Sequence, residues 1–139
     1  MLDSELRYRV DVRDEPPAAE GADAGCAVCT IRLRDAFLNY AFSDQLKDAL
    51  RKSVQERVER GVRNYVMDLT AVNVMDSCGL SVLIGVRKIV ESCRGRLVLV
   101  ATSPILLRLF SITRLDGVFE IVPDVASAEA ALHRPVGAA

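Results

Sequence analysis

Four consecutive residues, 76–79, combine a carboxylate, a hydroxyl, a thiol and a glycine, and they offer the clearest chemistry in the chain. They lie between a predicted buried strand that ends near Thr70 and a predicted helix that begins near Ser77. The N-terminus of a helix carries a positive field and unpaired backbone N–H groups, so it accommodates an anion such as phosphate. Ser77 is therefore a candidate phosphate acceptor. The simpler alternative is that Asp76 or Ser77 only caps the helix.

The cysteines offer a second kind of chemistry. Cys26 and Cys29 have the spacing of a redox or metal motif, but residues three apart on a strand point to opposite faces. Because no second pair follows and the chain has one histidine, we expect no metal site. Cys78 and Cys93 complete a set of four thiols, which we expect to be reduced. Oxidation of Cys78 would be one way to block modification of Ser77.

The residue pattern does not indicate an enzyme. His133, the one histidine, lies in a C-terminal tail that is predicted to fray over 134–139, so no Ser-His-Asp set can be assembled. No glycine-rich loop of the kind that cradles phosphates is present either. We therefore predict no catalytic residues and no cofactor.

The composition is that of an ordinary globular protein. Half of the 139 residues are apolar and 27% are charged, which suits a single domain over 1–139 with one hydrophobic core. Lys and Arg total 18 while Asp and Glu total 19, so no charge excess favours nucleic acid or an anionic membrane as partner. No segment resembles a secretory signal, and no apolar stretch is long enough to span a membrane. We therefore expect a cytoplasmic protein.

The elements that must position residues 76–79 alternate along the chain. Period-two patterns predict strands at 5–13 and 26–33, joined by a surface loop at 14–25. Buried strands are predicted at 64–70, 96–101 and 118–122. Helical spacing of apolar residues predicts helices over 43–61, 77–93, 103–112 and 128–132, the last of them capped by Ser127.

This order of elements predicts an α/β domain. Strands that alternate with helices from residue 43 onward imply a mostly parallel central sheet with right-handed crossovers. The first two strands would form an N-terminal β-hairpin and add antiparallel pairing. We therefore expect a mixed sheet of about five strands with about four helices. Functional groups of such sheets lie at the carboxyl ends of the strands, which is where 76–79 falls.

Several stretches of the chain resemble the STAS domains of anti-sigma-factor antagonists, also called anti-anti-sigma proteins. The segment 76–80 is similar to the family signature Asp-Ser-Ser/Thr-Gly-Leu, and 65–69 is similar to the strand before it. The segment 79–85 resembles the start of the family's next helix, and 97–110 resembles a later strand and helix. The resemblance covers about 6–133 and implies a STAS-like fold for nearly the whole chain.

The resemblance also implies a mechanism, known as partner switching. In this family the first hydroxyl after the Asp is phosphorylated by a Ser/Thr kinase of the GHKL type that doubles as an anti-sigma factor. The unphosphorylated protein binds this kinase and frees its other client, and a PP2C-type phosphatase removes the phosphate. The acceptor in this chain is Ser77, with Asp76, Cys78 and Gly79 as its neighbours. The family thus implies a phosphoprotein that regulates transcription through a sigma factor.

The expected effect of phosphorylation follows from the added charge. A phosphate on Ser77 carries about −1.5 to −2 charges at neutral pH. The field at a helix N-terminus favours an anion, so the fold should survive. A dianion placed beside Asp76 and against a bound partner is repulsive and costly to desolvate. We therefore expect phosphorylation to end binding and to leave the fold intact.

Candidate partner contacts surround the acceptor. They are Leu80, Ser81, Val82 and Gly85 on the predicted helix, and Asn39 and Tyr40 before the first long helix. Small residues on the helix either allow the backbone of a partner to approach or pack closely on the protein's own sheet. Leu80, Leu83 and Ile84 are more typical of core positions. We expect a monomer or a weak dimer.

The chain departs from the family pattern in three places. Residues 35–40 replace the family's Gly-Glu-apolar-Asp segment, and their apolar side chains belong either to the core or to an altered docking patch. Arg114 lies in a Thr-Arg-Leu triplet where the family prefers Ser-Gly-Leu, so an easy helix C-cap is lost. The loop at 14–25 is additional.

Two other functions are compatible with the same sequence. A STAS scaffold or adaptor subunit would share the fold without cycling through phosphorylation, and the altered 35–40 segment favours it somewhat. A small-molecule binder would use the cleft above Ser77 for a nucleotide or a lipid. A Ser77→Asp variant that binds its partner unchanged would favour the scaffold.

Overall fold

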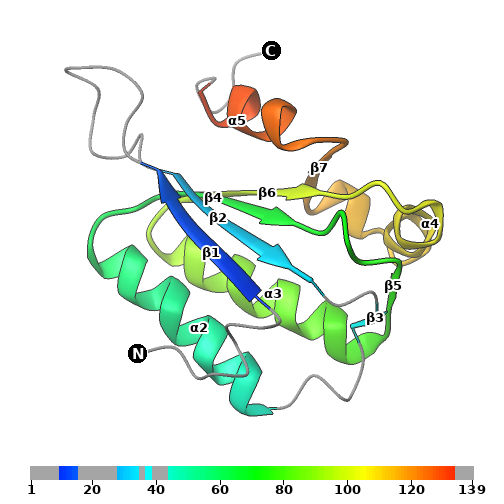
Figure 1. The fold of residues 1–139 in the computed structure, drawn as a ribbon, viewed down its shortest axis with the longest axis horizontal. Coiled ribbons are helices and arrows are strands. Elements are labelled where there is room, and N and C mark those ends of the chain that lie inside the picture. The colour runs from blue at the N-terminus through cyan, green and yellow to red at the C-terminus, as the bar shows by residue number, and fades with distance from the viewer. Residues whose placement is uncertain (1–9, 16–27, 35–36, 39–43, 134–139) are drawn as a thin grey trace.

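The computed structural model describes residues 10–15, 28–34, 37–38 and 44–133 (Figure 1). The strands are β1 (Val10–Glu15), β2 (Val28–Leu33), β3 (Phe37–Leu38), β4 (Asn64–Asp68), β5 (Val74–Met75), β6 (Arg96–Val100) and β7 (Glu120–Val122). The helices are α2 (Asp44–Glu59), α3 (Ser77–Ser92), α4 (Pro104–Ile112), the 3₁₀ turn η2 (Leu115–Gly117) and α5 (Val125–His133).

The central sheet is mixed and mostly parallel, as the sequence predicts. Its strand order is β1-β2-β4-β6-β7. β1 pairs with β2 in antiparallel fashion, with Val10 opposite Leu33, and the other neighbours are parallel. The predicted hairpin pairing and the α/β class with four α-helices in the described part of the chain are therefore confirmed. β1 extends to Glu15, so it includes the first two residues of the predicted loop.

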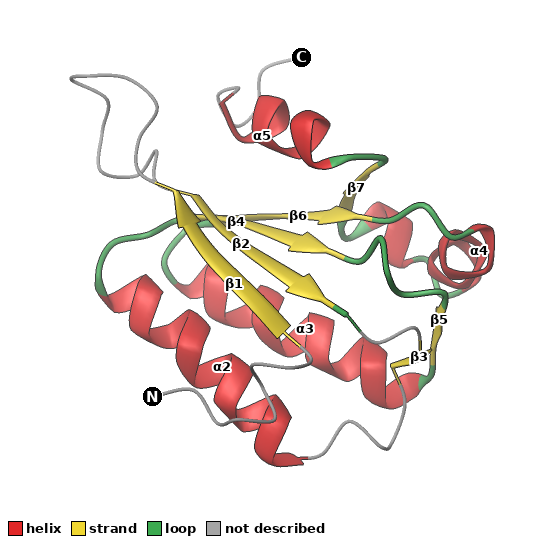
Figure 2. Cartoon of the chain, viewed as in Figure 1, coloured by secondary structure: helices red, strands yellow, loops and turns green. Residues whose placement is uncertain are grey.

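Helices cover both faces of this sheet. α2 and α3 lie side by side on one face, and α5 lies on the other (Figure 2). The alternation of side chains along each strand supplies both cores, because successive residues point to opposite faces. On β4, for example, Tyr65 and Met67 join the core under α2 and α3, whereas Val66 joins the core under α5. β4 and β6 are thus buried on both faces, as interior parallel strands are.

Two details of the C-terminal third differ from the sequence predictions. The strand expected at 118–122 is shorter, because the backbone N–H groups of Val118 and Phe119 both donate to the Leu115 carbonyl and continue the η2 turn. The helix expected from residue 128 begins at Val125, and its predicted Ser127 cap is wrong. The Asp124 carboxylate caps it by accepting the Ser127 backbone N–H at 2.6 Å. That bond, followed by one from the Ser127 side chain, lowers the pKa of Asp124 below its ordinary value of 3.8.

The predicted Cys-x-x-Cys pair is only half described. Cys29 is fully buried on β2 within the core under α2 and α3. Cys26 lies outside the described residues, so the structure does not test the pairing. In the described part of the chain, Cys29, Cys78 and Cys93 form no disulfide.

Candidate functional site

The segment that leads to residue 76 is held by a tight turn after β4. The Asp68 carboxylate accepts hydrogen bonds from the Thr70 backbone N–H at 3.0 Å and from the Thr70 hydroxyl at 2.7 Å. The Leu69 N–H donates to the Val100 carbonyl at 2.7 Å, which ties the turn to the end of β6. The path from β4 to α3 therefore starts from a fixed point at the carboxyl edge of the sheet.

One short strand, β5, then carries the chain to the site. β5 pairs in parallel with β3, with Leu38 opposite Met75, and forms a separate two-stranded sheet. The Ser103 hydroxyl, at the start of α4, donates to the Asn73 carbonyl at 2.7 Å. The Met75 side chain is buried in the main core. These contacts fix the chain directly before Asp76, the residue that enters α3.

Asp76 caps α3. Its Oδ1 atom accepts the backbone N–H groups of Cys78 at 2.9 Å and Gly79 at 3.2 Å. Its backbone is extended, and its carbonyl accepts the Leu80 N–H at 3.0 Å, so it stands at the boundary between loop and helix. The capping role that the sequence offers as the simpler alternative therefore belongs to Asp76. An N-cap of this kind is worth about 1 kcal/mol.

Ser77 is the first residue of α3, and it is exposed. Because the Asp76 carboxylate provides the cap, the fold does not use the Ser77 hydroxyl for that purpose. The structure also changes one expectation. The N–H groups of Cys78 and Gly79 are already bonded to Asp76, so they are not free to receive an anion attached to Ser77.

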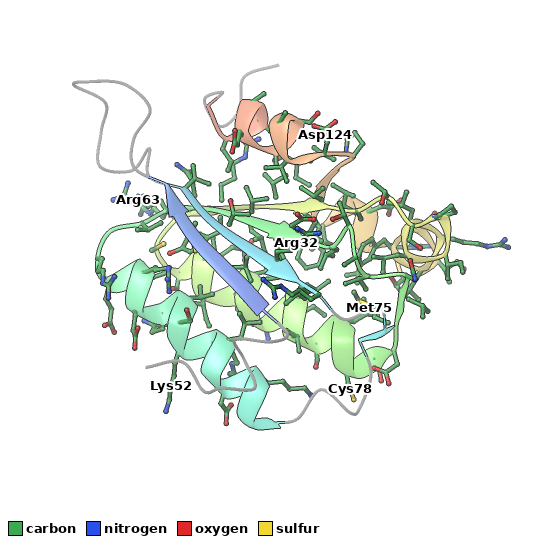
Figure 3. All side chains as sticks on the ribbon, viewed as in Figure 1. Arg32, Lys52, Arg63, Met75, Cys78 and Asp124 are labelled. Atoms are coloured by element: carbon green, nitrogen blue, oxygen red, sulfur yellow. The ribbon has the colours of Figure 1, made fainter. Side chains whose placement is uncertain are left out.

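The neighbours of Ser77 differ in exposure. Cys78 is half-buried at the tip of α3, near Met75 (Figure 3). Gly79 is buried and Leu80 is half-buried against the core, as the sequence suggests for Leu80. Ser81 is exposed, one helical turn beyond Ser77, and its hydroxyl donates to the Cys78 carbonyl at 2.7 Å. The exposed side of α3 therefore continues from Ser77 to Ser81.

The next turn of α3 separates core from surface in a way that the sequence does not predict. Val82 is 5% exposed and Leu83 is fully buried, so both pack in the core. Ile84, which is expected in the core, is 36% exposed. Gly85 is half-buried and faces α2, where Arg51 Nε would lie 3.9 Å from a Cβ added to the glycine. The sequence does not point to Ile84 or to the α2 residues opposite it, because the part of α3 that the neighbouring helix leaves open depends on tertiary packing.

The predicted contacts before α2 are only partly placed. Asn39 and Tyr40 lie outside the described residues. β3 ends at Leu38, directly before them, and its pairing with β5 brings the 37–38 backbone beside the residues that precede Asp76. The segment that departs from the family pattern therefore includes a strand that neighbours the approach to Ser77.

The described part of the chain contains neither a cluster of metal ligands nor a membrane-spanning helix. Within 10–15, 28–34, 37–38 and 44–133, no three His, Cys, Asp or Glu side chains are grouped so that they could hold a metal ion. None of the helices in this part of the chain has the length and apolar character needed to cross a membrane.

Comparisons with known proteins agree with this geometry. The model of the STAS domain family matches residues 25–128. Anti-sigma-B factor antagonists of Listeria monocytogenes and Listeria innocua are each 46% identical to this chain over 55 residues. Those matches cover 40% of this chain and 48% of each relative, so the chain aligns with about half the length of these curated relatives.

Solved structures extend the likeness over most of the fold. An anti-sigma factor antagonist from Mycobacterium paratuberculosis has a TM-score of 0.65 at 20% identity, covering 96% of this chain and 100% of that one. The Bacillus cell fate determinant SpoIIAA in its phosphorylated form has a TM-score of 0.57 at 18% identity, covering 87% and 99%. At these identities the likeness concerns the fold alone.

Proposed function

Because the chain belongs to the STAS domain family, we propose that it is an anti-sigma-factor antagonist that works by partner switching. In its unphosphorylated form it binds an anti-sigma factor that is also a Ser/Thr kinase of the GHKL type. Phosphorylation of Ser77 releases it, and a PP2C-type phosphatase restores the binding form. It acts in the cytoplasm as a regulatory protein without enzymatic activity, as a monomer or a weak dimer.

The observation that carries the proposal is that Asp76 caps α3 and leaves the Ser77 hydroxyl exposed and unused by the cap. Asp76 is half-buried and bonded to two backbone N–H groups of α3. Ser77 is exposed at the first helical position. A kinase can therefore reach the hydroxyl without opening the helix, and the loss of that hydroxyl proton removes no cap.

The same geometry explains how a phosphate would act. The amides of Cys78 and Gly79 serve the Asp76 carboxylate, so a phosphate on Ser77 would lie beside that carboxylate without binding these two amides. A bound protein that covers this surface would have to desolvate about two negative charges next to Asp76. That cost falls on the complex rather than on the isolated domain.

The relatives support the proposal at a coarser level. The Listeria proteins are named for antagonism of an anti-sigma-B factor. SpoIIAA has been solved in both unphosphorylated and phosphorylated forms. These names make an anti-sigma factor the first class of partner to test.

The test is a phosphorylation and binding experiment with purified proteins. Each GHKL-type kinase encoded by the source genome is incubated with this protein and ATP, and the phosphate is located by mass spectrometry. We expect phosphate on Ser77 and none on a Ser77→Ala variant. In calorimetric titrations, Ser77→Asp should weaken binding of the same kinase at least about tenfold, which is about 1.4 kcal/mol.

Ser111→Asp is the matched control, because it adds the same charge at an exposed serine on α4. It should bind the kinase like the wild type. If Ser77→Asp also binds like the wild type, the protein is a scaffold or adaptor that does not cycle. Binding of a nucleotide or lipid that is lost in Ser77→Asp, with no kinase partner, would instead support a small-molecule module.

A further inference from the structure

A groove between α2 and α3 begins one turn beyond Ser77. It encloses about 630 Å³. Its lining residues are Lys47, Asp48 and Arg51 from α2, and Ser81, Val82, Ile84, Gly85 and Lys88 from α3. The two helices lie side by side on the face of the sheet opposite α5 (Figure 2). The groove is therefore a separate feature from the helix cap at Asp76.

The groove has an apolar part. Val82 is nearly buried in the core, and Ile84 exposes 36% of its surface. Gly85 has no side chain to fill the space, and a Cβ there would only just contact Arg51. An apolar side chain of a bound molecule can thus pack against Ile84, and both side chains then lose contact with water.

The charged part of the groove is positive. Lys47, Arg51 and Lys88 supply three cations, and Asp48 supplies one carboxylate. Asp48 and Arg51 approach to 3.9 Å, but both side chains are more than half exposed, so this pair is weak. The whole chain carries a net charge of −1, so the groove departs locally from a slightly acidic molecule. Its complement is a segment that carries carboxylates around an apolar side chain.

The groove and Ser77 lie along the same side of α3. Ser77, Ser81, Ile84 and Lys88 are all exposed, and their spacing of three or four residues places them along one side of α3. The distance from Ser77 to Lys88 along the helix is about 16 Å. A single protein that covers Ser77 can therefore also reach the groove.

We infer that the groove is a docking surface for an acidic segment of the partner protein, with carboxylates near Arg51 and Lys88 and an apolar side chain against Ile84. The inference rests on the proposed function for the identity of the partner. It adds a reason for release, because a phosphate on Ser77 would face the acidic segment of the same partner. The repulsion would then act between the negative phosphate on this protein and the negative segment of its partner.

A defined probe tests the groove without the partner. The full chain, labelled with ¹⁵N, is titrated at low salt with a peptide that contains four glutamates around one leucine. We expect amide shifts within 47–51 and 81–88, and their loss in an Arg51→Glu, Lys88→Glu double variant that keeps the wild-type circular dichroism spectrum. No shift, or equal shifts with a lysine version of the peptide, would overturn the inference.

The second arm measures affinity for the anti-sigma factor. Arg51→Glu and Lys88→Glu should each weaken binding several-fold and together at least tenfold, whereas Arg108→Glu, an exposed charge reversal on α4, should leave it unchanged. If Ser77→Asp abolishes binding and the groove variants do not affect it, the groove inference fails and the proposed function stands. If the groove variants weaken binding and Ser77→Asp does not, the docking surface stands and the phosphorylation switch fails. If Arg51→Glu and Lys88→Glu weaken only the binding of phosphatidylserine vesicles and not that of the anti-sigma factor, the inference is also overturned.

Discussion

At the scale of single residues, Arg114 shows how a departure from the family pattern is accommodated. Its backbone has φ 61° and ψ 20°, the left-handed conformation that glycine adopts most easily. It follows Thr113, the C-cap of α4, and directly precedes η2, at the position where the family prefers glycine. The chain therefore keeps the turn and supports a side chain in a conformation that costs about 1–2 kcal/mol for an L-residue.

Replacement of Arg114 by glycine should stabilise the protein. The relief of the left-handed conformation exceeds the added freedom of the unfolded chain, which costs about 0.4–1 kcal/mol, so we expect a net gain of about 0.5–1 kcal/mol. Urea denaturation of the two proteins measures it. Arg108→Gly, in the exposed interior of α4, should instead lose about 1 kcal/mol. If both variants lose stability equally, the backbone of Arg114 is not strained in solution.

Residue-scale predictions from the sequence succeeded where a side chain has one local partner. A carboxylate directly before a helix is a strong cap signal, and Asp76 fulfils it. At α5 two residues carry the same signal, Asp124 and Ser127, and the structure shows that Asp124 is the cap and that the prediction of Ser127 is wrong. The choice depends on where the first turn of the helix begins, which is the least certain part of a sequence-based prediction.

At the scale of elements, α5 depends on a cap that titrates. The Ser127 backbone N–H, and then its side chain, hold the pKa of Asp124 below 3.8. The folded state thus favours the charged carboxylate. Its contribution to stability is present above the unfolded pKa and is lost as the pH falls through the lowered, folded pKa.

An Asp124→Asn variant isolates this contribution, because asparagine can still cap the helix but carries no charge. We expect the difference in free energy of unfolding between wild type and variant to be constant above about pH 5. As the pH falls below 3.8, the free energy of unfolding of the wild type should decrease relative to that of the variant. Denaturation at a series of pH values, with an NMR titration of the Asp124 carboxyl carbon, measures both quantities. A difference that does not change with pH would mean that the Ser127 bond does not persist.

The elements that sequence patterns missed are those that tertiary contacts create. β3 and β5 have two residues each, too few for any periodicity, and they exist because their backbones pair with each other. The open side of α3 was missed for a related reason. Apolar residues occur at so many positions of α3 that their spacing does not reveal which of them α2 covers, and Ile84 was assigned to the core.

At the scale of the whole molecule, the two faces of the sheet have different coverings. Among the described elements, α2 and α3 form a broad layer on one face, whereas α5 covers part of the other. Arg96 strengthens the thinner side. Its guanidinium donates to both carboxylate oxygens of Glu120 at 2.7 and 2.9 Å and to the Ala131 carbonyl at 2.6 Å. One side chain on β6 thus joins β7 and α5.

Because Ser77 lies outside both cores, a negative charge on it should leave the global fold unchanged. We expect Ser77→Asp to change the free energy of unfolding by less than about 1 kcal/mol, since the helix N-terminus offsets the repulsion from Asp76. Urea denaturation and ¹⁵N spectra measure this, with amide shifts expected only within about 74–81.

Ser111→Asp provides the opposite case, because it places the same charge in the last turn of α4, where the helix field disfavours it. It should lower the free energy of unfolding by about 0.3–1 kcal/mol. A large loss of stability in Ser77→Asp, or shifts spread over the sheet, would show that phosphorylation acts by loosening the domain.

The two hydrogen bonds that the Asp76 carboxylate accepts from the amides of Cys78 and Gly79 have a consequence for reversibility. A phosphate that accepted hydrogen bonds from those amides would be held against the helix N-terminus and protected from hydrolysis. Here the protein's own Asp76 carboxylate already accepts both amides, so under the proposed function a phosphate on Ser77 would stay accessible to a phosphatase. On that proposal, the rates of the kinase and the phosphatase would set how long the phosphorylated form lasts.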